Sequence, residues 1–223
     1  SIFRQTGTPL EEIRRCLQGQ SPAGTLSLLR EQRARLEEER QKLEQMEFIL
    51  SQAIGNLELG AAPDMVPKQA RFETEHLLAL PVEELEGLMH PGDGEDAMLI
   101  AVLERCRQLC RDYGLHSDYQ LGAIHAPGQA AEPGTIRFLY TRIKEKTDYP
   151  YYVEKSAGTY LYLCCRGRWD ISSGYAALAQ HLEESGIRTL GSIYACDLAG
   201  FILNGVEKNA VSMLSVRLAE PLS

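Results

Sequence analysis

Leucine recurs at every seventh position near the start of the chain, in a charged stretch without proline or glycine before Gly55. This spacing places one apolar line along one side of a helix and leaves Arg, Glu, Gln and Lys on the other faces. A line this narrow cannot form a globular core alone, so the helix needs a partner. The obvious partner is a second copy of the same helix. The line consists of Leu29, Leu36, Leu43, Leu50 and Leu57.

The positions between the leucines indicate how two such helices would pair. If the leucines occupy a positions, the d positions begin with the polar residues Gln32 and Glu39 and continue with Met46 and Ala53. Polar d positions disfavour a long parallel zipper. The pattern predicts a homodimer through a short antiparallel coiled coil, or a helix that also rests on its own domain. The residues assigned to the dimer contact are Leu29, Leu36, Leu43 and Leu50.

Charge is distributed unevenly along the 223 residues. Residues 1–57 hold eight Lys/Arg and eight Asp/Glu, so the whole net charge of −8 resides in residues 58–223. A nucleic-acid surface would be basic, so the C-terminal part is not expected to bind DNA. No apolar run approaches the roughly 20 residues that span a bilayer, and the N-terminus lacks a signal-peptide pattern. We therefore expect a cytoplasmic protein without a membrane partner.

The six cysteines and five histidines are dispersed, without the spacing of a metal site. The sequence also lacks the G-x-S-x-G, P-loop and dinucleotide-binding glycine motifs. We therefore assign no metal, no cofactor and no catalytic residue.

After the leucine-rich helix, expected over residues 23–54, Gly and Pro residues from Gly55 to Pro67 predict a linker. The order strand–helix–strand–strand then occurs twice. The sequence predicts an α+β fold, in which a long N-terminal dimerisation helix precedes a pseudo-twofold domain of two strand–helix–strand–strand repeats. The expected strands are 71–82, 119–125, 135–143, 151–165, 190–198 and 211–218, and the expected helices are 95–113 and 172–185.

Two parts of the sequence resemble known regulators. Residues 2–13, which end in Leu10-Glu11-Glu12-Ile13, resemble the end of the DNA-binding domain of MerR-family transcription regulators. A later series resembles the effector-binding domain of BmrR-like multidrug sensors and gyrase-inhibitor-like (GyrI-like) proteins. That series comprises Arg137–Tyr140, Lys155–Tyr162, Cys165–Trp169, Gly191–Tyr194 and residues 212–218.

The resemblance implies four parts: 1–20, the end of a MerR-type DNA-binding domain; 21–57, a coiled-coil dimerisation helix; 58–67, a linker; and 68–223, a GyrI-like effector-binding domain. The helix-turn-helix that precedes residue 1 in the family is absent from this sequence. Promoter DNA is therefore expected as a partner of the full-length protein and not of this chain alone.

The resemblance also implies a pocket of aromatic rings and an acid for a lipophilic cation. Strand alternation places Tyr160 and Tyr162 on one face and Leu161 and Leu163 on the other. The leucines are expected under the helices and the tyrosines in the pocket, where rings attract a cation and a buried carboxylate balances its charge. The expected ligand-binding residues are Phe138, Tyr140, Tyr152, Tyr160, Tyr162, Trp169, Asp197 and Phe201.

The acidic residue expected in the pocket departs from the family pattern. A Glu commonly follows the tyrosine that corresponds to Tyr194, but this chain has Ala195 there. Asp197 is the candidate replacement, followed by Glu154 and Glu207. If none of them faces the pocket, a neutral or anionic ligand is expected instead.

The sequence therefore predicts a ligand-sensing transcription regulator, not an enzyme, which signals through the dimer helix to DNA. Two alternatives stay open. One is a small-molecule hydrolase in which Glu154 and Tyr162 form an acid–base pair. The other is a protein-binding inhibitor of the gyrase-inhibitor type, which would have no use for the long helix.

Overall fold

The structure is a computed structural model that describes residues 22–86, 95–126, 136–167, 171–199 and 210–219, together with positions 11 and 14. The chain divides into two compact units, Ser1–Glu47 and Phe48–Ser223. The expected end of a DNA-binding domain over 1–20 lies almost wholly outside the described residues. None of the helices in the described ranges could cross a lipid bilayer.

The leucine-rich helix is α3, Pro22–Gly60. Its expected end at Ile54 is wrong, because the helix continues through Gly55. A glycine inside a helix costs about 1 kcal/mol relative to alanine. Contacts beyond it compensate, since Asn56 is buried and Leu59 packs against a hydrophobic cluster of the sheet. Tertiary packing therefore sets the end of α3 at Gly60.

The leucine line lies on an exposed face of α3. Leu36, Leu43, Leu50 and Leu57 are 47%, 63%, 62% and 57% exposed, and Leu29 is half-buried. Leu50 and Leu57 belong to the second unit, yet they do not pack on its sheet; Asn56 and Leu59 do so from a different side of the helix. Of the two expectations, a helix that also rests on its own domain is met at the C-terminal end of α3 by Asn56 and Leu59, and the antiparallel pair stays a prediction.

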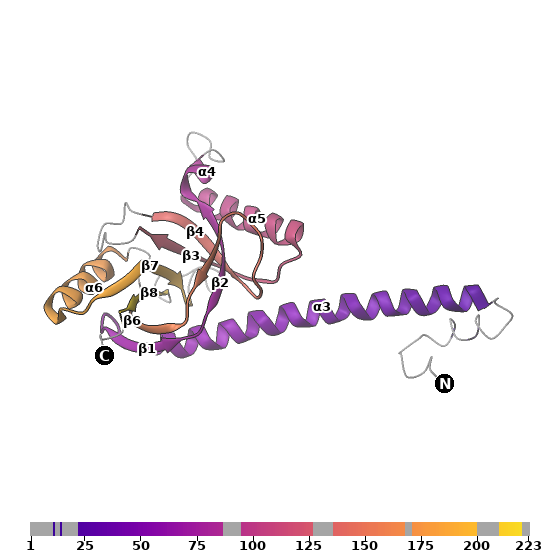
Figure 1. Ribbon diagram of the computed structural model, residues 1–223, viewed down its shortest axis with the longest axis horizontal. Coiled ribbons are helices and arrows are strands. Elements are labelled where there is room, and N and C mark those ends of the chain that lie inside the picture. Colours follow the sequence, from indigo (N-terminus) through magenta and orange to yellow (C-terminus); the bar gives the residue numbers. More distant parts are fainter. Residues whose placement is uncertain are drawn as a thin grey trace. The chain divides into compact units, whose positions relative to one another are not determined.

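The second unit contains the remaining elements (Figure 1). The strands are β1 Lys68–Phe72, β2 Glu75–Pro81, β3 Ser117–His125, β4 Ile136–Ile143, β5 Tyr152–Lys155, β6 Gly158–Arg166, β7 Thr189–Asp197 and β8 Val211–Leu218. The helices are α4 Val82–Glu86, α5 Glu95–Tyr113 and α6 Ser172–Ser185.

The eight strands of the described residues form one antiparallel sheet, in the order β1-β6-β8-β7-β3-β4-β2-β5. The two expected repeats are present as β2-α5-β3-β4 and β6-α6-β7-β8. Each forms a three-stranded group, with neighbours β2-β4-β3 in one and β6-β8-β7 in the other, and the groups meet where β3 pairs with β7. The predicted pseudo-twofold α+β domain is therefore confirmed.

The two short strands are exchanged between the repeats. β1 precedes the first repeat but pairs with β6 of the second, and β5 precedes the second repeat but pairs with β2 of the first. The single strands predicted over 71–82 and 151–165 are each broken in two, at residues 73–74 and 156–157. Each outer edge of the sheet is thus formed by a strand from the other half.

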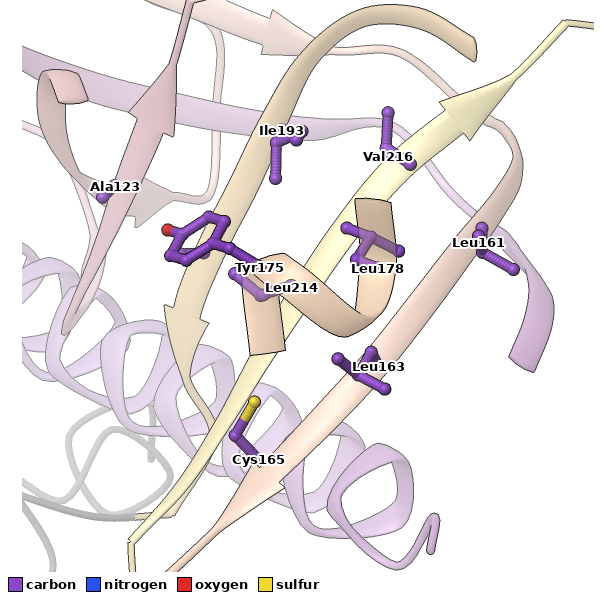
Figure 2. Packing of buried hydrophobic residues seen from close by; sticks show 10 residues of the cluster. Ala123, Leu161, Leu163, Cys165, Tyr175, Leu178, Ile193, Leu214 and Val216 are labelled. Atoms are coloured by element: carbon purple, nitrogen blue, oxygen red, sulfur yellow. The ribbon is translucent and has the colours of Figure 1, made fainter. Parts of the chain in front are cut away.

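Helices α5 and α6 cover the leucine face of the sheet. Tyr175 and Leu178 of α6 pack on Leu161 and Leu163 of β6 in one cluster (Figure 2). In the first repeat, Val102 and other apolar residues of α5 pack on the corresponding face of β2 and β4. The prediction that the leucines of β6 lie beneath a helix is confirmed.

On the other face, a glycine allows one tyrosine to lie across a neighbouring strand. Gly122 of β3 pairs with Tyr140 of β4, and a Cβ atom at Gly122 would lie 2.2 Å from the ring carbon Cζ of Tyr140. No side chain larger than hydrogen fits there while the ring keeps its position. Gly122 therefore determines where this fully buried ring can lie.

We expect Gly122→Ala to lower the free energy of unfolding by about 1–3 kcal/mol, because the added methyl overpacks the core against Tyr140. Gly55→Ala is the control: its Cβ would meet nothing within 4 Å, and the better helix former should stabilise the protein by about 1 kcal/mol. Urea unfolding measures both. A Gly122→Ala protein as stable as the wild type would contradict the placement of the Tyr140 ring.

Candidate ligand site

The sheet face opposite α5 and α6 carries four of the ten tyrosines. We call it the tyrosine face, defined by Tyr140, Tyr160, Tyr162 and Tyr194. Tyr140, Tyr160 and Tyr162 are buried and Tyr194 is half-buried, in two adjoining hydrophobic clusters. Phe72 of β1 joins them and packs edge-on against Tyr160 and Tyr162, with ring centroids 5.2 and 6.0 Å apart.

A lysine lies at the centre of these rings. The Nζ atom of Lys155, from β5, is 5.0 Å from the ring centroid of Phe72 and 5.3 Å from those of Tyr160 and Tyr194. It also donates a hydrogen bond of 2.6 Å to Oε2 of Glu75. We call the three rings and this carboxylate the aromatic cage. Lys155 itself is only 2% exposed.

The cage is part of a larger buried charge network. Glu75 also forms an ion pair with Arg142 of β4, at 3.6 Å, and Nε of Arg142 donates a hydrogen bond of 2.7 Å to Asp118. Two positive and two negative groups thus lie together. Burial acts to raise the pKa of the Glu75 carboxyl, but Lys155 and Arg142 outweigh burial and hold this pKa below its usual value.

The network reaches α3. Nη2 of Arg142 donates a hydrogen bond of 3.0 Å to Oδ1 of Asn56, and Nδ2 of Asn56 donates one of 2.5 Å to Gln120 of β3. Asn56 is 1% exposed, so these bonds satisfy a polar group that burial would otherwise penalise. A continuous chain of polar contacts therefore joins Lys155, Glu75, Arg142 and Asn56.

A hollow of about 250 Å³ opens beside the cage. Tyr160 and Tyr194 are among its lining residues, and the ring centroids of the same two residues lie 5.3 Å from Nζ of Lys155. Deeper on the tyrosine face, Ser215 of β8 pairs in register with Tyr162 and Tyr194. Its buried hydroxyl has no hydrogen-bond partner among the described residues. The remaining lining residues are Glu154, Ser156, Leu190, Gly191, Ser192 and Arg217.

The structure brings together four of the eight expected ligand-binding residues. Phe138, Tyr140, Tyr160 and Tyr162 all belong to the clusters of the tyrosine face. Trp169 and Phe201, and the weaker acid candidate Glu207, lie outside the described residues. The two other residues, Tyr152 and Asp197, lie elsewhere.

Tyr152 packs with the α5 cluster, where its hydroxyl lies 2.6 Å from Nδ1 of His76. Its expected place beside Tyr160 is wrong, because the break at 156–157 makes β5 a separate strand with its own alternation. Asp197 shares the face of Ala195, which packs in the α6 cluster. The expected position of Asp197 on the tyrosine face is therefore also wrong.

The acid that contacts the rings' lysine is Glu75, and the sequence pattern did not predict a site role for Glu75, Lys155, Arg142 or Phe72. Alternation along β2 carried a signal, because Glu75 shares parity with Leu77 and Ala79, two apolar residues of the tyrosine face. The position of Lys155 depends on the pairing of β5 with β2, which local pattern does not reveal.

The structure does not bring the expected acid–base pair together. Glu154 accepts a 3.5 Å hydrogen bond from Tyr152, whereas the ring of Tyr162 packs against Phe72. His125 is buried, and its Nε2 is hydrogen-bonded to the hydroxyl of Tyr175 in the α6 cluster. Within the described ranges, no three His, Cys, Asp or Glu side chains gather as a metal site would require.

We expect Glu75→Gln to lower the free energy of unfolding at pH 7 by about 3 kcal/mol, because it leaves the buried Lys155 ammonium without its counter-ion. Because the pKa of Glu75 is depressed by folding, its contribution is complete above the unfolded-state value of about 4.5 and is lost as the pH falls through the folded-state value. Between pH 7 and pH 3, the free energy of unfolding measured with urea should therefore fall less steeply in the variant than in the wild type.

Glu154→Gln is the matched control, since Glu154 is the exposed neighbour of Lys155 on the same strand. Its stability should stay within about 0.5 kcal/mol of the wild type. Equal losses in the two variants would show that the Glu75–Lys155 pair contributes nothing specific.

No protein-family model matches the chain. A curated relative is the multidrug-efflux transporter 2 regulator of Bacillus subtilis (strain 168), which is 23% identical over 146 residues, or 66% of this chain and 51% of that protein. The match therefore spans about half the length of this relative.

Two solved structures share the fold. The crystal structure of the EcmrR C-terminal domain superposes with a TM-score of 0.54 and 10% identity, over 70% of this chain and 98% of that one. EcmrR in the cryo-EM structure of the EcmrR–DNA complex in EcmrR-RPo gives a TM-score of 0.50 and 10% identity, over 98% of this chain and 80% of that one. The fold and the related regulator together confirm the resemblance of this chain to MerR-type regulators with a GyrI-like domain.

Proposed function

We propose that this chain is the ligand-sensing part of a non-enzymatic transcription regulator. In this proposal, a small hydrophobic and cationic molecule binds at the tyrosine face, α3 pairs two copies, and ligand binding is signalled through α3 to promoter DNA. The DNA step belongs to the whole regulator. It is supported by the relative's name, a multidrug-efflux transporter regulator, and by the DNA-bound state of EcmrR.

The observation that carries the proposal is the polar chain from the aromatic cage to α3. Lys155, Glu75, Arg142 and Asn56 follow one another at contacts of 2.6, 3.6 and 3.0 Å. A ligand that alters the charge balance at Glu75 alters the balance at Arg142, and Arg142 is bonded to the helix. Because these groups are buried, water screens the effect only weakly.

The chemistry of the tyrosine face supports a hydrophobic ligand. Aromatic walls offer apolar area and attract delocalised cations, and Glu75 supplies the negative charge that the sequence analysis sought at Asp197. The hollow beside Tyr160 and Tyr194 gives an approach from solvent. The unpartnered hydroxyl of Ser215 is a group that a polar substituent of the ligand would satisfy.

The exposed leucine line of α3 supports the homodimer. Its residues share one side of the helix with Met46 and Ile54, which are also more than half exposed. A contiguous apolar strip of this kind marks an interaction surface. An antiparallel partner helix would cover it and leave Asn56 free to stay bonded to Arg142.

We expect wild-type protein to bind tetraphenylphosphonium, a lipophilic cation, more tightly than the neutral triphenylphosphine oxide in calorimetric titrations. Tyr194→Ala should weaken cation binding tenfold or more, because Tyr194 lines the hollow and its ring belongs to the cage. Tyr113→Ala is the control, since Tyr113 is an exposed ring of α5. If Tyr194→Ala and Tyr113→Ala bound the cation with equal affinity, the tyrosine face would be ruled out as the binding site.

Signalling has a separate readout. In the wild type, bound tetraphenylphosphonium should change amide hydrogen exchange of residues 48–60 in α3. Asn56→Ala should keep the affinity within a few-fold but abolish this change, because the helix loses its bond to Arg142. An unaltered exchange response in Asn56→Ala would rule out this route.

The dimer contact is tested by charge insertion. Leu43→Glu together with Leu50→Glu should convert the dimer to a monomer in analytical ultracentrifugation, because carboxylates would be buried unpaired between the helices. Gln41→Glu is the control, since Gln41 is exposed on the opposite side of α3 from Leu43. Its sedimentation should match the wild type, and a dimer that survives the double leucine substitution would place the contact elsewhere.

A further inference from the structure

Lys155 has the surroundings that a bound organic cation would require. Its ammonium is within 5.3 Å of three ring centroids and pairs with one carboxylate. Aromatic faces and an acid are the combination by which proteins recognise alkylammonium groups. In this structure the cation is part of the protein.

The ion pair with Glu75 accounts for the burial of Lys155, but it does not account for the three rings around the ammonium group. Lysine is almost never fully buried unless it is paired, and a pair requires only a counter-ion. Glu75 meets that requirement alone, and it is also paired with Arg142. The three rings add an attraction that a simple ion pair does not need. They come from β1, β6 and β7, so distant parts of the sheet converge on one ammonium group.

The route by which Lys155 enters is also unusual. It is the last residue of β5, a strand of four residues at the edge of the sheet, whose one partner among the described strands is β2. A short edge strand is held by few backbone hydrogen bonds, so its terminal side chain can be withdrawn at lower cost than one from a central strand.

We propose that the aromatic cage is a binding site for a monovalent organic cation, and that Lys155 is its tethered occupant, with which a free cation competes. The proposal rests on the proposed function for the entry of an external ligand, and it identifies the competitor that this ligand must displace. Displacing Lys155 replaces one cation beside Glu75 by another. The pairing of Glu75 with Arg142, and hence the bond to Asn56, then depends on how closely the new cation approaches.

Chemical rescue tests the cage without reference to any natural ligand. Lys155→Ala removes the atoms of a propylammonium group. We therefore expect the variant to melt below the wild type, and 100 mM n-propylammonium chloride to raise its Tm by about 3 °C or more relative to sodium chloride. n-Propanol, which has the same size without the charge, should not do so. Lys155→Met, which refills the space with a neutral side chain, and Lys155→Ala/Glu75→Gln, which lacks the carboxylate, should not respond to the ammonium.

Lys155→Ser is a second variant that leaves similar space and offers Glu75 a hydroxyl, and it should show the same rescue. If either variant folds only in propylammonium, that result counts as rescue. The proposal would be overturned if propylammonium raised the Tm of both Lys155→Ala and Lys155→Ser by no more than it raises that of Lys155→Met. It would also be overturned if propanol raised the Tm of these two variants as much as propylammonium does.

Competition gives the second measurement. Lys155→Ala should bind tetraphenylphosphonium at least tenfold more tightly than the wild type, because the tethered competitor is gone. Rescue by propylammonium in a protein whose wild type binds neither probe would support the cage and count against the proposed effector. If the wild type binds tetraphenylphosphonium, propylammonium does not rescue Lys155→Ala, and that variant binds tetraphenylphosphonium with unchanged affinity, the proposed effector would be supported and the cage proposal overturned.

Discussion

The ion pair between Lys155 and Glu75 holds the tyrosine face together. A buried ammonium without a counter-ion would cost several kcal/mol, and so would a buried carboxylate, so neither group is tolerable alone. Their contact fixes β5 against β2, brings Phe72, Tyr160 and Tyr194 around one charge, and sets the position of Arg142 through Glu75. The packing of the rings and the attachment of α3 both depend on this balance of charges.

Local pattern predicted those elements whose limits are set locally. The helix 172–185 and the strand 211–218 have the expected bounds, and the alternation of Tyr160 and Tyr162 with leucines correctly assigned the two faces of β6. The end of α3 escaped prediction because Asn56 and Leu59 stabilise helix beyond Gly55 through contacts with the sheet. Helix propensity contains no information about such contacts.

The candidate site was harder to predict than the fold, for a related reason. Its aromatic residues lie on strands with clear alternation, so Tyr140, Tyr160 and Tyr162 were found. Its charges become neighbours only through strand register: Glu75 faces Lys155 because β2 pairs with β5 across a separation of 80 residues. Tyr152 was misplaced because one break, at residues 156–157, shifted the parity of everything before it.

The exchange of β1 and β5 makes the two repeats interdependent. The edge strand of each half of the sheet lies next to the other half in the sequence. Neither repeat can therefore reach its native edge by itself, and the domain should gain and lose its structure as one cooperative unit.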